Sequence, residues 1–304
     1  MVMRKVLVVG AAGFIGQHLV RALAAAGVSV IAQVHQRQTT FGHGVQTVSA
    51  DTTAETLLQD CDAVAWLASG TTPAGSASDP LPELRSNLAP LLKLLHTLQS
   101  RPDCHLLYVS SGGTLYGDVD RPASESLAAH PRSYYAAGKA AAEHFIEAWC
   151  QQHSGTATVL RPSNVYGPGQ TLHGGFGVIP AAMACLRDGK PMTLWGDGES
   201  LRDYLYIDDF IAACMAVLQR PSPQGLRVFN VCSGQATSLR QLLALIEQVA
   251  GRTLQREQRP VRAVDLRRVL LDGTRIREAL GWAPRTSLHD GLQSTWRWLN
   301  AAQP

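Results

Sequence analysis

A short apolar segment, a glycine-rich turn and an amphipathic segment follow one another near the start of the chain, and they constrain its fold more than any other feature. Residues 5–9 read Lys-Val-Leu-Val-Val, a continuous apolar run typical of a buried parallel strand. The turn at residues 10–16 reads Gly-Ala-Ala-Gly-Phe-Ile-Gly, and the periodic segment after it ends at Gly27. A strand, a glycine-rich turn and a helix in this order predict a dinucleotide-binding unit.

The three glycines of this turn have different physical tasks. Gly10 permits the tight turn, Gly13 lets the backbone approach a pyrophosphate, and Gly16 allows the helix to pack closely on the strand. The first N–H groups of the helix are then available to phosphate oxygens. The sequence therefore predicts that the chain binds a dinucleotide cofactor, NAD or NADP.

The end of the second predicted strand, residues 29–34, bears on the choice between these cofactors. An NAD enzyme usually carries an acid there to bind the ribose hydroxyls, and this chain has none. His35 or Arg37 is available to a 2′-phosphate instead, which slightly favours NADP, although both are also ordinary loop residues. Asp51, after a third predicted strand at residues 45–49, is placed to accept a hydrogen bond from the adenine amine.

Apolar strands alternate with amphipathic helices through the first half of the chain. Its remaining strands and long helices are predicted at residues 62–68, 81–99, 105–110, 134–152 and 156–161. This alternation predicts an α/β fold with a doubly wound parallel sheet, the Rossmann architecture. We assign residues 1–168 to an NAD(P)-binding domain, with a returning segment at about 203–232. The composition changes after Gly169, so we assign residues 169–304 mainly to a smaller C-terminal substrate-binding domain.

Tyr135 and Lys139 are four residues apart in a predicted helix, so both side chains lie on one face of it, one turn apart. A phenol with a pKa of about 10 is a poor base at neutral pH, and a neighbouring ammonium group lowers that pKa. Such a tyrosine can exchange a proton with an alcohol or a ketone while hydride moves elsewhere. The spacing alone also fits a surface pair, and the dinucleotide turn is what gives it weight.

Hydroxyl groups follow the strand predicted at residues 105–110. Residues 110–117 read Ser-Ser-Gly-Gly-Thr-Leu-Tyr-Gly. Ligands of open α/β sheets bind at the carboxyl ends of the strands. We therefore expect hydroxyls of this segment to contact a substrate oxygen beside Tyr135.

Composition limits the classes of partner. The 304 residues carry a net charge of +3, too small to indicate nucleic acid or an anionic membrane as a partner. No apolar run approaches the roughly 20 residues of a membrane span, and the first one is too short for a signal peptide. Six scattered cysteines without metal-ligand spacing indicate free thiols and no metal site. These features predict a cytoplasmic soluble protein.

Four motifs occur along the chain in an order that is typical of one protein family. They are Gly-Ala-Ala-Gly-Phe-Ile-Gly at 10–16, Tyr-Ala-Ala-Gly-Lys at 135–139, Arg-Pro-Ser-Asn-Val-Tyr-Gly-Pro-Gly at 161–169 and Arg-Asp-Tyr-Leu-Tyr-Ile-Asp-Asp at 202–209. Together they resemble the extended short-chain dehydrogenase/reductases, and within these the nucleotide-sugar epimerase/dehydratase family of UDP-galactose 4-epimerase-like enzymes. The motifs span most of the chain and are specific to the superfamily, but not to a substrate.

The resemblance implies a cofactor site and a substrate site. Cofactor contacts are implied for Gly10, Gly13, Phe14, Ile15, Gly16, Asp51, Leu67, Ala68, Tyr135 and Lys139. Substrate contacts are implied for Asn164, Val178, Leu194, Arg202 and Arg262. The two arginines would clamp the diphosphate, because a guanidinium gives bidentate bonds to phosphate oxygens. Lys139 would hold the nicotinamide ribose and tune Tyr135.

One departure concerns the hydroxyl of the family's Ser–Tyr–Lys set. The family has Ser or Thr four residues before the tyrosine of a Tyr-Gly pair, and here Gly112 stands four residues before Tyr116. Ser111 or Thr114 supplies the missing hydroxyl in our interpretation, with Thr114 preferred. The remaining possibility is that Tyr135 acts with a water molecule.

The leading functional hypothesis is an NAD(P)-dependent nucleotide-sugar 4-epimerase that works by hydride transfer through a 4-keto intermediate. The alternative is an NADPH-dependent reductase of nucleotide 4-keto-sugars, supported by the missing acid after the second strand. A dehydratase is disfavoured, because Gly113 and Thr114 stand where it would carry its acid/base pair. A non-catalytic dinucleotide-binding protein is favoured by Gly112 alone. The resemblance also implies polysaccharide biosynthesis as the pathway and a homodimer formed by helices 81–99 and 134–152.

Overall fold

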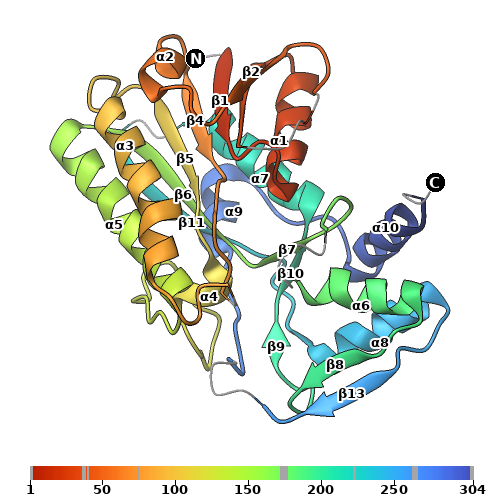
Figure 1. Ribbon diagram of the computed structural model, residues 1–304. Helices are drawn as coiled ribbons and strands as arrows, with labels where there is room; N and C mark the ends of the chain where they lie inside the picture. The colour runs from red at the N-terminus through yellow and green to blue at the C-terminus, as the bar shows by residue number, and fades with distance from the viewer. Residues whose placement is uncertain are drawn as a thin grey trace.

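The computed structural model describes residues 3–35, 39, 41–73, 75–171, 177–221, 224–261 and 266–301. Two of the predicted site residues, Arg37 and Arg262, lie outside this described part of the chain. Figure 1 shows a sheet covered by helices on both faces and, below it, a smaller part built from helices and short strands.

Seven parallel strands form the main sheet, in the order β11-β6-β5-β4-β1-β2-β3. Their bounds are β1 Lys5–Val9, β2 Ser29–Val34, β3 Val45–Ser49, β4 Ala63–Trp66, β5 His105–Val109, β6 Thr156–Pro162 and β11 Gly225–Val231. The strand order reverses between β1 and β4, which is the mark of a doubly wound sheet. The predicted fold class is therefore confirmed.

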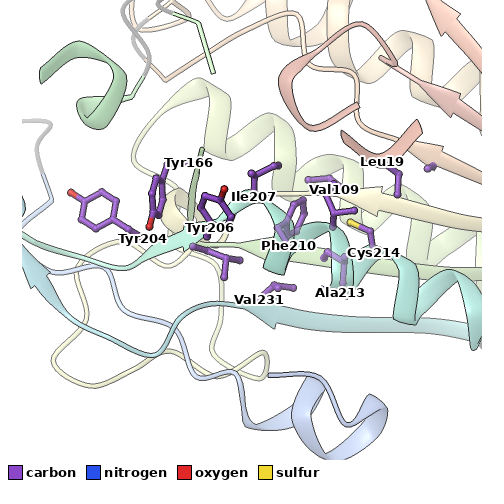
Figure 2. Packing of buried hydrophobic residues seen from close by; sticks show 14 of the residues in the cluster. Leu19, Val109, Tyr166, Tyr204, Tyr206, Ile207, Phe210, Ala213, Cys214 and Val231 are labelled. Carbon is purple, nitrogen blue, oxygen red and sulfur yellow. The ribbon is translucent and has the colours of Figure 1, made fainter. Parts of the chain in front are cut away.

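Two hydrophobic clusters cover the two faces of this sheet. One cluster packs α1 (Phe14–Ala25) and α7 (Ile207–Gln219) on the strands, with Leu19, Phe210 and Cys214 among its buried members (Figure 2). The other packs α2 (Ala54–Leu58), α3 (Ala89–Leu98) and α5 (Tyr134–His153) on the opposite face. Strands buried on both faces explain why the sequence shows continuous rather than alternating apolar runs.

The smaller part contains three two-stranded sheets and three helices among the described residues. The strand pairs are β7 (Asn164–Tyr166) with β10 (Tyr204–Tyr206), β9 (Leu201–Arg202) with β12 (Thr237–Ser238), and β8 (Met192–Trp195) with β13 (Arg256–Arg259). The helices are α6 (Val178–Asp188), α8 (Leu239–Ala250) and α10 (Leu288–Ala301), whereas α9 (Thr274–Leu280) packs against β11 of the main sheet. Ser238 caps α8 as predicted, in a capping box with Gln241.

The helix predicted at residues 81–99 is not regular along its length. Its first part is a π-helix, η1 (Glu83–Leu88), and α3 begins only at Ala89. Pro90 has no N–H, so it cannot donate the bond that a regular helix would make to the carbonyl of Ser86. The short helix α4 (Gly112–Leu115) was not predicted, because four residues are too few for a periodic pattern.

Two buried aspartates, Asp203 before β10 and Asp209 in α7, bind the segment that connects the smaller part to the main sheet. The Asp203 carboxylate accepts bonds from the hydroxyl of Ser163 at 2.6 Å and from the backbone N–H of Gly234 at 2.7 Å. The Asp209 carboxylate accepts from the backbone N–H groups of Arg285 and Thr286 at 3.0 and 2.9 Å. No helix in the described ranges is long and apolar enough to cross a membrane.

Candidate active site

The glycine-rich turn lies directly against the chain that leaves β4. Gly10 has a φ of +86°, and a Cβ atom there would stand 2.7 Å from the backbone nitrogen of Ala68. A Cβ at Gly16 would overlap the carbonyl oxygen of Gly10. A larger residue at Gly10 would push the turn away from Leu67 and Ala68, and a larger residue at Gly16 would push α1 away from the turn. The close packing predicted from Gly10 and Gly16 is therefore present.

The start of α1 fits the pyrophosphate of a dinucleotide. Gly13 is the N-cap residue, no side chain caps the helix, and its first turn carries no acid. The first N–H groups of a helix attract an anion through hydrogen bonds and the helix dipole. The residues at this turn, including Phe14 and Ile15 at the helix start, therefore fit the cofactor that the sequence predicts.

His35 and Asp51 follow the two neighbouring strands β2 and β3, which are paired in register from Val30 and Val45 to Val34 and Ser49. Both side chains are exposed. The Asp51 carboxylate accepts a bond from the Ser49 hydroxyl at 3.3 Å. The structure thus places the two residues at the same edge of the sheet, the edge where the turn of α1 begins.

Tyr135 and Lys139 lie in the first two turns of α5, whose N-cap Ser133 accepts a bond from the N–H of Ala136 at 3.2 Å. The Lys139 side chain is buried, and its Nζ atom donates to the carbonyl of Val109 at 3.0 Å. Nζ lies 5.8 Å from the centroid of the Tyr135 ring. The two groups share one side of the helix, at the carboxyl end of β5.

Burial moves both proton affinities away from their usual range. It raises the pKa of Tyr135 to about 12, although hydrogen bonding by the Ser111 and Ser69 hydroxyls acts in the opposite direction. Burial lowers the pKa of Lys139 to about 8, against the charges of Glu83 and Glu143. The expectation that Lys139 gives the phenol a lowered pKa is therefore wrong for the protein groups by themselves. The reason is the desolvation of the buried phenol, which cannot be inferred from the spacing of two residues in the sequence.

The two candidate hydroxyls lie side by side. Thr114 Oγ1 donates to Ser111 Oγ at 3.0 Å, and Ser111 is the one of the two whose hydroxyl acts on Tyr135. A chain of hydroxyl groups therefore leads from Thr114 through Ser111 to the phenol. This arrangement favours Ser111 over Thr114, the residue preferred from the sequence.

Gly112 has no room for the serine or threonine that the resemblance leads us to expect at this place. A Cβ atom there would overlap Leu271 Cδ1 and stand 2.8 Å from the carbonyl oxygen of Arg161. Leu271 belongs to a late segment of the chain that pairs with Ala123. The missing hydroxyl is thus replaced by an apolar contact between distant parts of the sequence.

The expected substrate residues are only partly brought to this place. Asn164 lies near the hydroxyl segment, with its Oδ1 atom 3.7 Å from where a Cβ of Gly113 would be, and its Nδ2 atom donates to the carbonyl of Asp203. Val178 begins α6, Leu194 lies in β8, and the Arg202 guanidinium donates to the Leu201 and Leu266 carbonyls. These three belong to the smaller part.

Sequence reasoning missed a buried charge network beneath Lys139. The Glu143 carboxylate pairs with Arg161 at 2.5 Å and accepts from the hydroxyl of Ser110 at 2.5 Å. Arg161 also donates to the hydroxyl of Tyr116 at 2.6 Å. Glu143 is one helical turn beyond Lys139, so the i, i+4 spacing could have identified it. Within the described ranges, no group of three His, Cys, Asp or Glu residues could hold a metal ion.

We predict that Gly112→Ser destabilises the protein instead of restoring a catalytic hydroxyl. The added atoms must displace Leu271 and meet a backbone carbonyl, which should cost about 1–3 kcal/mol. Thermal unfolding of Gly113→Ser is the control, because a Cβ there would meet only Asn164 Oδ1, at an ordinary contact distance of 3.7 Å. Equal melting temperatures for the two variants would contradict this account.

Comparison with known proteins agrees with this geometry. The model of the NAD dependent epimerase/dehydratase family matches residues 6–232. The chain is 33% identical to UDP-glucose 4-epimerase of Mycolicibacterium smegmatis, over 96% of this chain and 97% of that protein. It is 31% identical to GDP-6-deoxy-D-mannose reductase of Pseudomonas aeruginosa, over 96% and 95%.

Solved structures of the same group have the same fold. UDP-glucose 4-epimerase of Thermotoga maritima with UDP-glucose superposes with a TM-score of 0.90 at 29% identity, covering 98% of this chain and 99% of that one. The Thermus thermophilus UDP-glucose 4-epimerase in complex with NAD gives 0.89 at 30% identity, covering 98% and 100%. With its dinucleotide turn, its Tyr135–Lys139 pair and these matches, the chain belongs to the NAD-dependent epimerase/dehydratase family.

Proposed function

We propose that the protein is an NAD(P)-dependent nucleotide-sugar 4-epimerase that works through a 4-keto intermediate. The observation that carries this proposal is the position of Tyr135 and Lys139 at the carboxyl end of β5, the same edge of the sheet as the turn of α1 that fits a dinucleotide. The similarity to UDP-glucose 4-epimerases along almost the whole chain supports the same reaction.

The residues of the site divide the proton chemistry among them. Tyr135, as phenolate, takes the proton of the C4 hydroxyl group and later returns it to the oxygen of the keto sugar. Ser111, linked to Thr114, holds that sugar oxygen next to the phenol. Lys139 is held by the Val109 carbonyl at a place where it can bind the ribose beside Tyr135. A bound nicotinamide would supply the hydride acceptor and donor that chemistry at C4 needs.

The smaller part of the molecule is proposed to bind the nucleotide sugar. We assign this role mainly to residues 169–304, with residues 1–168 and the returning segment at about 203–232 holding the cofactor. Arg202 and Arg262 would clamp the diphosphate, since guanidinium groups bind phosphate oxygens in pairs. Asn164, Val178 and Leu194 would contact the sugar nucleotide along the way, as the similarity to UDP-sugar epimerases suggests.

A reductase of nucleotide 4-keto-sugars is the second candidate. It would perform only the second half of the reaction, with Tyr135 as the proton donor and NADPH as an exchangeable cofactor. The absence of an acid at the end of β2 favours it, as does the similarity to a GDP-6-deoxy-D-mannose reductase. In a reductase, His35 and Arg37 would bind the 2′-phosphate of NADPH. The Thermus thermophilus epimerase, which is 30% identical to this chain, was solved in complex with NAD instead.

Denaturing the purified protein and assaying the released nicotinamide cofactor separates these candidates. An epimerase regenerates its cofactor in every turnover, so we expect stoichiometric release of bound NAD. Binding of NADPH in preference to NADH by a protein that releases nothing would support the reductase instead. Titration of both cofactors into His35→Ala would show whether that side chain contributes to the preference.

Tyr135→Phe removes the proton-transfer group while keeping the ring. We expect turnover to fall by about 10²–10⁴-fold with little change in cofactor affinity, because the phenol acts in the chemical step. Tyr134→Phe is a matched control, since that neighbouring tyrosine is 45% exposed. Turnover of Tyr135→Phe at the level of this control would exclude the catalytic role.

We also propose a homodimer and a cytoplasmic location. Exposed apolar side chains lie along η1 and α5, which pack against each other, and they include Leu84 at 51% and Phe145 at 45% exposure. A second copy of the chain would cover this face of two helices. All six cysteines are free thiols, as expected in a reducing compartment.

Phe145→Glu tests the dimer by placing a charge on this face. Light scattering should give the mass of two chains for the natural protein and of one chain for the variant, because an unpaired buried carboxylate disfavours association. Leu127→Glu serves as control, since Leu127 is exposed but lies outside both helices. A natural protein with the mass of one chain would rule the dimer out.

A further inference from the structure

Glu83 is a buried carboxylate next to the catalytic pair, and none of the sequence motifs includes it. Its side chain lies in η1 and only 6% of the residue is exposed. Oε2 accepts a bond from Asn87 Nδ2 at 2.7 Å, whereas Oε1 has no hydrogen-bond partner. A buried carboxylate is costly unless it is paired, so a half-satisfied one at this place requires an explanation.

The carboxylate of Glu83 is pressed against the turn of α5 that carries the catalytic residues. A Cβ atom at Gly138 would stand 2.8 Å from Oε2 of Glu83 and 3.4 Å from its Cβ. Gly138 is the direct neighbour of Lys139 and lies three residues after Tyr135. The absence of a side chain at Gly138 therefore lets the carboxylate reach the side of the catalytic turn.

Asn87 holds the carboxylate in this position. It lies in the same π-helix, and its amide also donates to Thr71 Oγ1 at 2.7 Å and accepts from the N–H of Gly70 at 2.8 Å. These bonds tie η1 to the chain after β4, which also carries Ser69, one of the hydroxyls that act on Tyr135. The π-helix thus places Glu83 between this loop and α5.

The other titratable groups near Tyr135 and Lys139 are either paired with an opposite charge or neutral. Glu143, on α5, is paired with Arg161 from β6. Tyr108, on β5, lies with its ring centroid 5.0 Å from the Lys139 ammonium and carries no charge, because burial raises its pKa. Glu83 is therefore the carboxylate near Lys139 that has no cationic partner of its own.

We propose that Glu83 is a positioning residue whose negative charge sets the protonation of Lys139 and Tyr135, and with it the pH range in which the site works. The charge favours the ammonium of Lys139 and opposes the phenolate of Tyr135. It therefore raises the pKa of both groups, which agrees with the sign of its effect on each. Removing the charge should lower both pKa values together. Only the activity part of this inference rests on the proposed function.

Glu83→Gln tests the proposal with a readout that needs neither substrate nor cofactor. The chain has only four lysines, so isotope-labelled lysine side chains can be titrated individually by NMR, with Lys139 identified from the spectrum of Lys139→Met. We expect the midpoint of Lys139, about 8 in the natural protein, to fall by about one pH unit in Glu83→Gln. Glu83→Asp keeps the charge and should return the midpoint toward its natural value.

Glu147→Gln is the matched control, because it removes an exposed carboxylate from α5, the helix that carries Lys139. It should leave the titration midpoint of Lys139 unchanged. In the active enzyme, both limbs of the pH profile of kcat/KM should move to lower pH in Glu83→Gln. An unchanged Lys139 midpoint, even together with a lower melting temperature or a lower kcat, would show a merely structural role and overturn the proposal. Absence of epimerase activity in the natural protein would refute the proposed function and leave the titration to decide on Glu83.

Discussion

The bond from the Lys139 ammonium to the Val109 carbonyl is the interaction on which the site depends. It fixes the first turns of α5 to the end of β5, so it determines where Tyr135 stands relative to the sheet. The bond also holds an ionisable amine inside the protein, where desolvation lowers its pKa. The surrounding carboxylates make this position tolerable, and Glu143 is itself balanced by Arg161. The position of the catalytic tyrosine therefore depends on the charges buried around Lys139.

Residues from the second half of the chain contribute directly to the packing of the site. Leu271 fills the space beside Gly112, and the buried Asp203 holds the turn at Ser233 and Gly234 against the segment between β9 and β10. A mutation in these distant segments can therefore act on the hydroxyl segment at 110–114 without touching a ligand. Leu271 thus occupies the space that a larger side chain at Gly112 would need.

The epimerase and the reductase reactions would use the same residues but differ in the direction of proton transfer. Tyr135 must first accept a proton in an epimerase, whereas in a reductase it only donates one. Burial raises the pKa of Tyr135 to about 12, so with the protein groups alone the phenol is protonated at neutral pH and is in the form that can donate a proton. The charge of a bound oxidised nicotinamide would favour the phenolate, since an opposite charge stabilises the ionised form. The cofactor and its oxidation state thus decide which reaction the same arrangement supports.

The sequence by itself determined the dinucleotide turn, the alternation of strands and helices, and the shared face of Tyr135 and Lys139. Each of these is written in residues that are close in the chain, through turn chemistry and the periodicity of apolar side chains. Only the tertiary structure decided that a π-helix buries Glu83 against Gly138, that Leu271 takes the place of a hydroxyl, and that the phenol has a raised pKa. These properties depend on which distant segments meet and on how much water they exclude, and local patterns in the sequence contain neither.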